Sequence, residues 1–187
     1  VSKDQEVCGK EDKVSEMLVV SAGKGIKNAV VSLAEIQKGK SMTLPESGPV
    51  IKQQGCVFQP HVLVVPAGAS VDILNDDGIL HNFHTTSKVN PVINRAQPQF
   101  MKKMKGKFDK PEVIKVGCDV HSWMSAWIVV ADHPYYAVTD ENGVFALNDV
   151  PPGAYKLEIW HESLGTVTKD VTVSGADEAK VAIELGQ

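Results

Sequence analysis

Short apolar runs recur along most of the chain, and Gly, Pro, Asn or Asp separates one run from the next. Runs of this length rich in β-branched residues are typical of strands. No segment keeps a helical period over three turns, and the best helical candidate, 99–107, is weakened by Gly106. The chain is therefore predicted to be all-β. The expected strands are 17–20, 29–33, 62–65, 71–75, 113–118, 126–131, 143–147, 155–160, 167–173 and 179–185.

Two segments show opposite kinds of pattern. In 179–185, apolar Val181, Ile183 and Leu185 alternate with Lys180, Ala182 and Glu184, which predicts a strand with one buried face. The segment 88–110 has little regular pattern, two prolines and several lysines, and is predicted to be a long surface excursion. Its lysines are Lys88, Lys102, Lys103, Lys105, Lys107 and Lys110.

Length and composition fit an ordinary globular protein. The chain has 187 residues, 43% of them apolar and 22% charged, with a formal net charge of −4. This length allows one large domain or two small ones, and we expect two. The charge gives no reason to expect nucleic acid or an anionic membrane as a partner. No apolar run is long enough to span a bilayer, and the start, 1–4, lacks the features of a signal peptide. We therefore expect a mature chain or a cytosolic one.

The three cysteines divide into two groups, Cys8 and Cys56 in the first third and Cys118 far downstream. If Cys118 binds a metal, the other two can form a disulfide, which would indicate an oxidising compartment. Two free buried thiols are the alternative, because sequence alone does not place the two Cα atoms within bridging distance.

The residues that carry chemistry lie in a loop between two expected strands. Cys118, His121 and Met124 offer a thiolate, an imidazole and a thioether, which are soft and borderline ligands that suit copper in both oxidation states. Two His and one Cys with a weak axial Met form the electron-transfer set of blue-copper sites. Zinc is a rival for Cys and His, but a thioether is a poor zinc ligand. The loop holds only one His, so a second must come from elsewhere.

The second histidine is expected in 75–84, where His81 and His84 compete. Residues three apart on a strand point to opposite faces, so only one of them can face the loop. Phe83 shares a face with His81 and indicates that this face is buried. The pattern therefore favours His81 and leaves His84 outward.

The run from about Pro49 to Asp132 resembles a small cupredoxin of the plastocyanin and amicyanin kind. The resemblance rests on Phe58–Pro60, Val64–Gly68, Val71–Asn75, the pair His81-Asn82, and the short spacing from Cys118 through His121 to Met124, which is that of amicyanin. It implies a cupredoxin Greek-key β-sandwich. It also implies equatorial ligands His81, Cys118 and His121, an axial Met124, and an Asn82 that ties the two ligand loops together. Amicyanin has Pro after the second His, where this chain has Ser122.

The C-terminal part resembles a carboxypeptidase-regulatory-like, transthyretin-like β-sandwich. The motifs are Val138–Phe145 and Val150–Leu157, and an opening strand of the same kind lies earlier, at Gly25–Leu33. The resemblance implies a smaller second β-sandwich, formed by 1–47 plus 133–187, with the cupredoxin of 48–132 inserted between its strands. A cupredoxin with a long N-terminal arm and a separate C-terminal module is the alternative. Such sandwiches generally have no chemistry of their own, so a scaffolding or docking role is expected.

Together these features predict a mononuclear blue (type 1) copper protein, not an enzyme, that carries single electrons outside the cytoplasm. A periplasmic or secreted location is expected, and the partner would be a redox protein such as a c-type cytochrome, dehydrogenase or oxidase. Lys102 to Lys110 either steer an acidic partner or form an ordinary solvated face. Copper delivery without redox traffic is the alternative function. An enzyme such as a nitrite reductase ranks last, because it needs a second copper centre or an open substrate position and the sequence shows no second His cluster.

Overall fold

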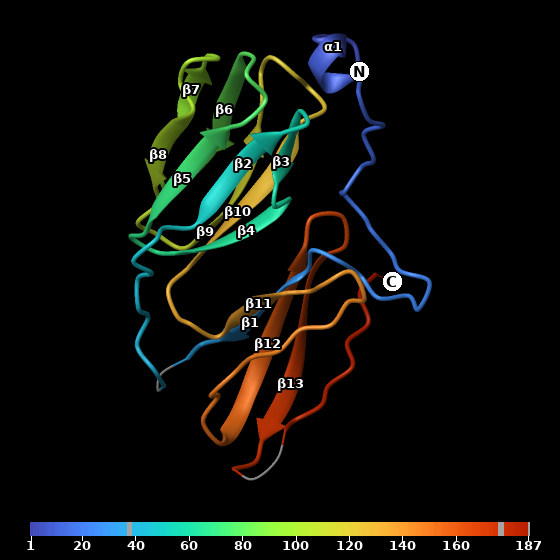
Figure 1. The fold of residues 1–187 in the computed structure, drawn as a ribbon. Helices are drawn as coiled ribbons and strands as arrows, with labels where there is room; N and C mark the ends of the chain where they lie inside the picture. The colour runs from blue at the N-terminus through green and yellow to red at the C-terminus, as the bar shows by residue number, and fades with distance from the viewer. Residues whose placement is uncertain (37–38, 176–177, 187) are drawn as a thin grey trace. The chain divides into compact units, whose positions relative to one another are not determined.

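A computed structural model describes residues 1–36, 39–175 and 178–186. The chain folds into two compact units. Unit 1 comprises Val1–Val14 and Met42–Asp132, and unit 2 comprises Ser15–Ser41 and His133–Gln187. Strands dominate both units, and the one helix among the described residues is the short α1, Gln5–Cys8 (Figure 1). The predicted all-β class is confirmed.

Two mixed sheets form unit 1. One has the order β4-β10-β9-β6-β7 and the other the order β3-β2-β5-β8. Their strands are β2 (Val50–Gln54), β3 (Val57–Gln59), β4 (Val62–Pro66), β5 (Ser70–Asn75), β6 (His81–Thr86), β7 (Asn94–Gln97), β8 (Lys103–Lys107), β9 (Glu112–Gly117) and β10 (Ser125–Ala131).

The core of unit 1 follows from strict alternation along these strands. In β10, Ala126, Ile128 and Val130 are buried while their neighbours are partly exposed. Apolar residues of both sheets join them in one cluster, and Phe58 meets Phe83 edge to face with ring centroids 5.8 Å apart. The sheets therefore pack face to face as a sandwich, and the loops at one end of it carry the residues of interest.

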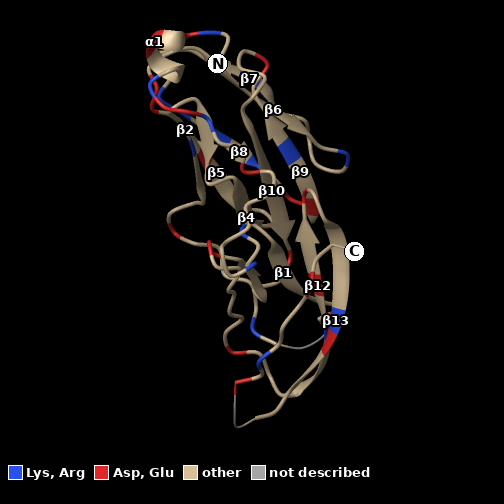
Figure 2. Ribbon diagram, turned by 90° about the vertical axis from the view of Figure 1, so that its right-hand side faces the viewer, with Lys and Arg blue, Asp and Glu red and all other residues tan. Residues whose placement is uncertain are grey.

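The segment 88–110 differs from the sequence prediction, because it contains two strands rather than a long surface excursion. The helical candidate 99–107 is also wrong, since β8 occupies its second half. Met104 and Gly106 of β8 are buried while Lys103, Lys105 and Lys107 are exposed, which is a period of two (Figure 2, Lys in blue). A glycine on the inward face hid this alternation: a Cβ there would lie 2.9 Å from the side chain of Ile93.

The N-terminal segment, Val1–Val14, belongs to unit 1, whereas the sequence interpretation grouped it with the second sandwich. Cys8 and Cys56 form a disulfide with a Cα separation of 5.3 Å, and both side chains are fully buried. The predicted disulfide is thus confirmed, and it attaches this segment to unit 1.

Unit 2 is built on one sheet of order β11-β1-β12-β13. Its strands are β1 (Val30–Ala34), β11 (Tyr136–Val138), β12 (Gly153–His161) and β13 (Gly165–Val173). Its buried core consists of Ala29, Val31, Leu33, Tyr135, Leu157 and Ile159.

Three predicted strands of unit 2 are absent from the described sheet. Residues 17–20 contribute only an isolated bridge between Val20 and Ile26. Residues 143–147 follow a turn in which the Asp140 carboxylate accepts N–H bonds from Asn142 and Val144. Residues 179–185 form no ladder, yet Val181, Ile183 and Leu185 pack on the core as their alternation predicted.

Within the described residues, no helix has the length and apolar character needed to cross a membrane.

Candidate metal centre

Three predicted ligands from two separate parts of unit 1 lie together. His81 begins β6, and Cys118 and His121 lie in the loop between β9 and β10; one donor atom from each lies within 4.8 Å of the others. His81 and His121 are 0% exposed and Cys118 is 5% exposed. The centre is therefore shielded from solvent.

The ligand loop, 118–124, is closed by the strands on either side of it. Gly117 at the end of β9 pairs with Ser125 at the start of β10. Met124 is 2% exposed, and its backbone N–H donates to the carbonyl of His121 at 3.0 Å. Met124 is thus held in the tight turn that begins at His121.

His84, the rival candidate, lies outside the cluster. Its side chain is 36% exposed, and its Nδ1 lies 3.0 Å from the carboxylate of Asp119. Phe83, by contrast, is fully buried in the sandwich core. The alternation along β6 explains why the structure brings His81, not His84, to the cysteine.

The loop before β6 positions His81 through Asp77. Asn75, at the end of β5, shapes this loop by donating from Nδ2 to the carbonyls of Ile79, at 2.8 Å, and Gln97, at 2.9 Å. Asp77 Oδ2 lies 2.8 Å from His81 Nε2 and also accepts the backbone N–H of Cys56 at 2.9 Å. Burial raises the pKa of Asp77, but the bonds from His81 and the backbone outweigh it, so the pKa is lowered and the carboxylate stays charged.

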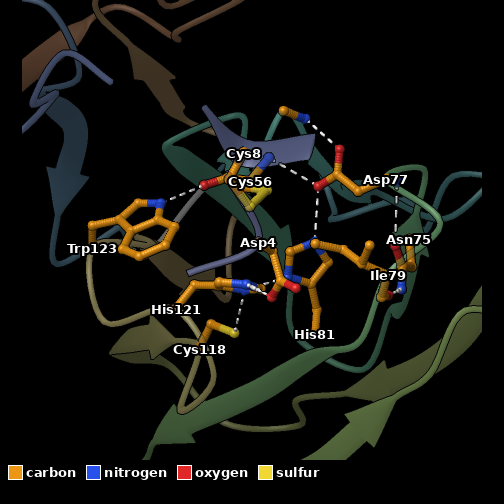
Figure 3. Close-up of a disulfide and its surroundings, with 11 residues drawn as sticks. Asp4, Cys8, Cys56, Asn75, Asp77, Ile79, His81, Cys118, His121 and Trp123 are labelled. Atoms are coloured by element: carbon orange, nitrogen blue, oxygen red, sulfur yellow. Dashed lines mark hydrogen bonds and ion pairs between the residues drawn. A yellow bond between two sulfur atoms is a disulfide. The ribbon is translucent and has the colours of Figure 1, made fainter. Parts of the chain in front are cut away.

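His121 has a carboxylate partner of its own, Asp4, which comes from the N-terminal segment (Figure 3). Its Nε2 lies 2.8 Å from Asp4 Oδ2. The ring of Trp123 lies beside it, with centroids 5.1 Å apart, and Trp123 donates its indole N–H to the carbonyl of Cys56 at 3.1 Å. The whole ring of His121 is therefore enclosed by protein.

The two imidazoles turn the same nitrogen inward, and His81 Nδ1 lies 3.0 Å from His121 Nδ1. When each Nε2–H donates to its carboxylate, two acceptor lone pairs face each other, and a cation or a proton between them is favoured. Burial lowers the pKa of His81, but Asp77 and the nearby Cys118 raise it to about 9. A positive charge is thus stabilised at this point.

The thiol of Cys118 is set up to ionise. Burial raises its pKa, but His81 and the backbone N–H of Asn82 lower it to about 6. That N–H donates to Sγ at 3.3 Å, while Asn82 Oδ1 accepts the N–H of Asp119 at 3.3 Å. Asn82 therefore links the two ligand loops beside the sulfur, as the sequence resemblance predicted.

The donor set suits a single soft or borderline metal ion. His121 Nδ1 lies 3.8 Å from Cys118 Sγ and 3.0 Å from His81 Nδ1, separations that two ligands of one ion can span with bonds of about 2.0–2.3 Å. One thiolate and two imidazoles, each imidazole oriented by a carboxylate, match the chemistry of copper. The residues present therefore fit the predicted metal.

The sequence interpretation missed Asp77 and Asp4 as partners of the two histidines. Asp77 lies four residues before His81 in a turn, so an acidic residue near the ligand was visible in the sequence. Asp4 carried no such signal, because 117 residues separate it from His121.

A family model and several solved structures are similar to parts of this chain. The model of the carboxypeptidase regulatory-like domain matches residues 125–186, which include β10 of unit 1 and most of unit 2. No curated protein matches the chain in sequence. The match supports the second of the two resemblances predicted from the motifs.

Solved structures similar to this chain include a nitrite reductase, a cupredoxin and an amicyanin. The copper-containing nitrite reductase of Thermus scotoductus SA-01 is 21% identical with a TM-score of 0.39, covering 50% of this chain and 25% of that chain. A purple cupredoxin from Nitrosopumilus maritimus is 22% identical with a TM-score of 0.38, covering 44% and 99%. Amicyanin from Paracoccus versutus is 13% identical with a TM-score of 0.41, covering 54% and 97%.

This chain thus spans a quarter of the nitrite reductase chain. In sequence, the C-terminal part resembles a carboxypeptidase regulatory-like domain, as the motifs predicted.

Proposed function

We propose that unit 1 binds one copper ion through Cys118, His81 and His121, with Met124 as the axial ligand, and carries single electrons between redox proteins. The observation that carries this proposal is the buried group formed by the Cys118 sulfur and two inward-facing imidazoles, whose donor atoms all lie within 4.8 Å of one another. Copper, when bound, supplies a one-electron couple, Cu(I)/Cu(II).

The protein residues hold the ligands in place and keep water out. Asn82 donates to the sulfur of Cys118, and Asp77 fixes the orientation of His81. The strands on either side of the ligand loop, β9 and β10, pair with each other, and β6, which carries His81, pairs with β9. The ligands therefore have little freedom to move. A fixed, dry ligand set reorganises little when the charge of the centre changes, which favours electron transfer.

A carrier fits this burial better than an enzyme does. A catalytic metal needs an open position for substrate, and the two histidines have no exposed surface. Burial also favours retention of the metal over its transfer to another protein, which was the alternative predicted from the sequence.

The disulfide supports a location outside the cytoplasm, in the periplasm or after secretion. A redox protein such as a c-type cytochrome, dehydrogenase or oxidase is the corresponding partner. The lysines of 102–110 contribute less positive field than their number indicates, because Lys103 pairs with Asp72 and Lys107 with Asp109.

Cycling the copper-loaded protein between oxidant and reductant, with a copper chelator present, tests the proposed function. A carrier is expected to take up and release one electron per chain over repeated cycles while it keeps its metal. Loss of copper to the chelator after the first reduction would contradict the proposal and favour copper delivery. A protein that binds zinc and no copper would contradict both functions.

A further inference from the structure

The ring of His121 is covered by a segment that lies far from the ligand loop in the sequence. Asp4 lies in the N-terminal segment, 117 residues before His121, and its carboxylate contacts the outward nitrogen of the ring (Figure 3). The side chain of Asp4 is 38% exposed, while that of His121 is 0% exposed. Asp4 therefore lies between His121 and the solvent.

We propose that Asp4 is a positioning residue for His121, and that the Cys8–Cys56 disulfide holds it there. This inference rests on the proposed copper site. It adds a part of the chain outside both ligand loops to the metal centre.

The local backbone presents Asp4 to His121 and leaves its side chain no other role in α1. The backbone carbonyl of Asp4 accepts the N–H groups of Val7, at 3.0 Å, and Cys8, at 2.8 Å, so it begins the helix. The side chain makes no cap hydrogen bond. Asp4 has a left-handed backbone conformation, φ 50° and ψ 45°, and its carboxylate contacts His121 instead of capping the helix.

The disulfide fastens this segment at the edge of the centre. Cys8, four residues after Asp4, is bonded to Cys56. The backbone of Cys56 contacts both ligand loops: its N–H donates to Asp77 at 2.9 Å, and its carbonyl accepts the indole N–H of Trp123 at 3.1 Å. The position of Asp4 is thus set relative to both histidines.

The chemical consequence follows from the hydrogen bond and the charge. A carboxylate that accepts Nε2–H keeps Nδ1 free to bind metal, fixes the ring orientation and makes the imidazole a stronger donor. Stronger electron-pair donation by the imidazole and the negative charge of the carboxylate both stabilise Cu(II) more than Cu(I). Asp4 is therefore expected to lower the reduction potential of the centre and to strengthen Cu(II) binding.

Two substitutions at this position distinguish the effect of the Asp4 charge from the effect of its side chain covering His121, and neither strains the backbone. Asp4→Asn removes the charge and keeps an oxygen acceptor, and Asp4→Gly removes the whole side chain; both residues tolerate a left-handed conformation. Asp12→Asn, at an exposed residue of the same segment, makes the same change of net charge and serves as the control.

The first measurement is the affinity of each variant for Cu(II) and Cu(I), together with its reduction potential. Asp4→Gly is expected to weaken Cu(II) binding about 10–100-fold. A tenfold larger loss for Cu(II) than for Cu(I) raises the potential by about 59 mV. Asp4→Asn should shift the potential in the same direction, and Asp12→Asn should leave it unchanged.

The second measurement needs no copper. Acylation of histidines in the metal-free protein, followed by mass spectrometry, is expected to label His121 slowly in the wild type and faster in Asp4→Gly. The half-exposed His84 should label equally in both, and intact Cys8–Cys56 in the variant shows that the segment is still attached.

The outcomes distinguish this inference from the proposed function. If the wild type gives no copper-thiolate spectrum while His121 labelling still depends on Asp4, the proposed function fails and the contact stands. If copper binds normally, but Asp4→Asn and Asp4→Gly have the potential and labelling of Asp12→Asn, the role of Asp4 is refuted.

Discussion

The side chains around Cys118 show how single residues give the centre its character. The pKa of Cys118 is lowered to about 6, which favours the thiolate at neutral pH. The pKa of His81 is raised to about 9, which favours the protonated imidazole. Asp77 and Asp4 hold the outward nitrogens of the two histidines. Each of these contacts fixes the orientation of one histidine ring.

Away from the candidate metal centre, Glu112 is another carboxylate whose pKa is set by hydrogen bonds. Its carboxylate accepts the backbone N–H groups of Lys88, Val89 and Asn90, and the side-chain amide of Asn90. Burial raises its pKa, but these bonds together outweigh that effect and lower it to about 2. The residue therefore ties the loop after β6 to the start of β9.

We expect Glu112→Gln to lower the free energy of unfolding by about 1 kcal/mol at pH 7, a value that allows for solvent screening. The folded pKa is below the unfolded one, so this stabilisation is complete above about pH 4.5 and is lost as the pH falls towards 2. Urea unfolding of both proteins across this range checks it, with the exposed Glu46→Gln as control. A wild-type advantage that is still undiminished near pH 2 would refute the assignment.

The ligand types could be predicted from the sequence, but their outer partners could not. Cys118, His121 and Met124 share one loop, and the alternation around Phe83 distinguished His81 from His84. Asp4 depends on a disulfide that brings a distant segment to the loop, and neither spacing nor period encodes that approach. Local pattern therefore predicts the candidate ligands, whereas tertiary structure supplies the residues that orient them.

The N-terminal segment, Val1–Val14, belongs to unit 1, where the sequence interpretation did not place it. It contains little regular structure beyond α1, and Cys8 is its one fully buried residue. Charged residues of both signs lie on either side of α1 (Figure 2). The disulfide is thus its main attachment.

We expect the double variant Cys8→Ser, Cys56→Ser to be less stable by about 2–4 kcal/mol, because 48 residues separate the two cysteines. Its reduction potential should rise, as for Asp4→Asn, because the segment no longer holds the carboxylate on His121. Denaturant unfolding and voltammetry measure the two effects. A destabilised variant with an unchanged potential would show that the disulfide supports the fold alone.

Strands with apolar side chains at every second position could be predicted, and strands with interrupted alternation could not. β10 and β12 lie close to their expected bounds. β8 was read as a possible helix because a glycine takes one inward position and lysines fill the outward ones. Residues 179–185 have the alternation of a strand and its buried face, but no neighbouring strand pairs with them in the described structure. The alternation of apolar residues predicts which side chains face the core, whereas strand pairing depends on whether another strand lies alongside.

At the scale of the whole molecule, the chain consists of two units with separate cores. The three inward-facing donors all belong to unit 1. A ligand that binds only one folded unit stabilises that unit.

We therefore expect copper to slow amide hydrogen exchange in 118–124 and around His81, and to leave exchange in β12 and β13 unchanged. Hydrogen exchange of the full chain with and without Cu(I), read by mass spectrometry, makes this comparison. Equal protection of both units would contradict a site built from unit 1 alone.

The most direct test of the copper site is the visible and electron-paramagnetic spectrum after one equivalent of Cu(II) is added. The account predicts an intense thiolate-to-copper band in the wild type that saturates at one copper per chain and is absent in Cys118→Ala. His84→Ala should keep the band, because that side chain lies outside the cluster. A colourless wild-type protein, or a band that persists in Cys118→Ala, would contradict the account.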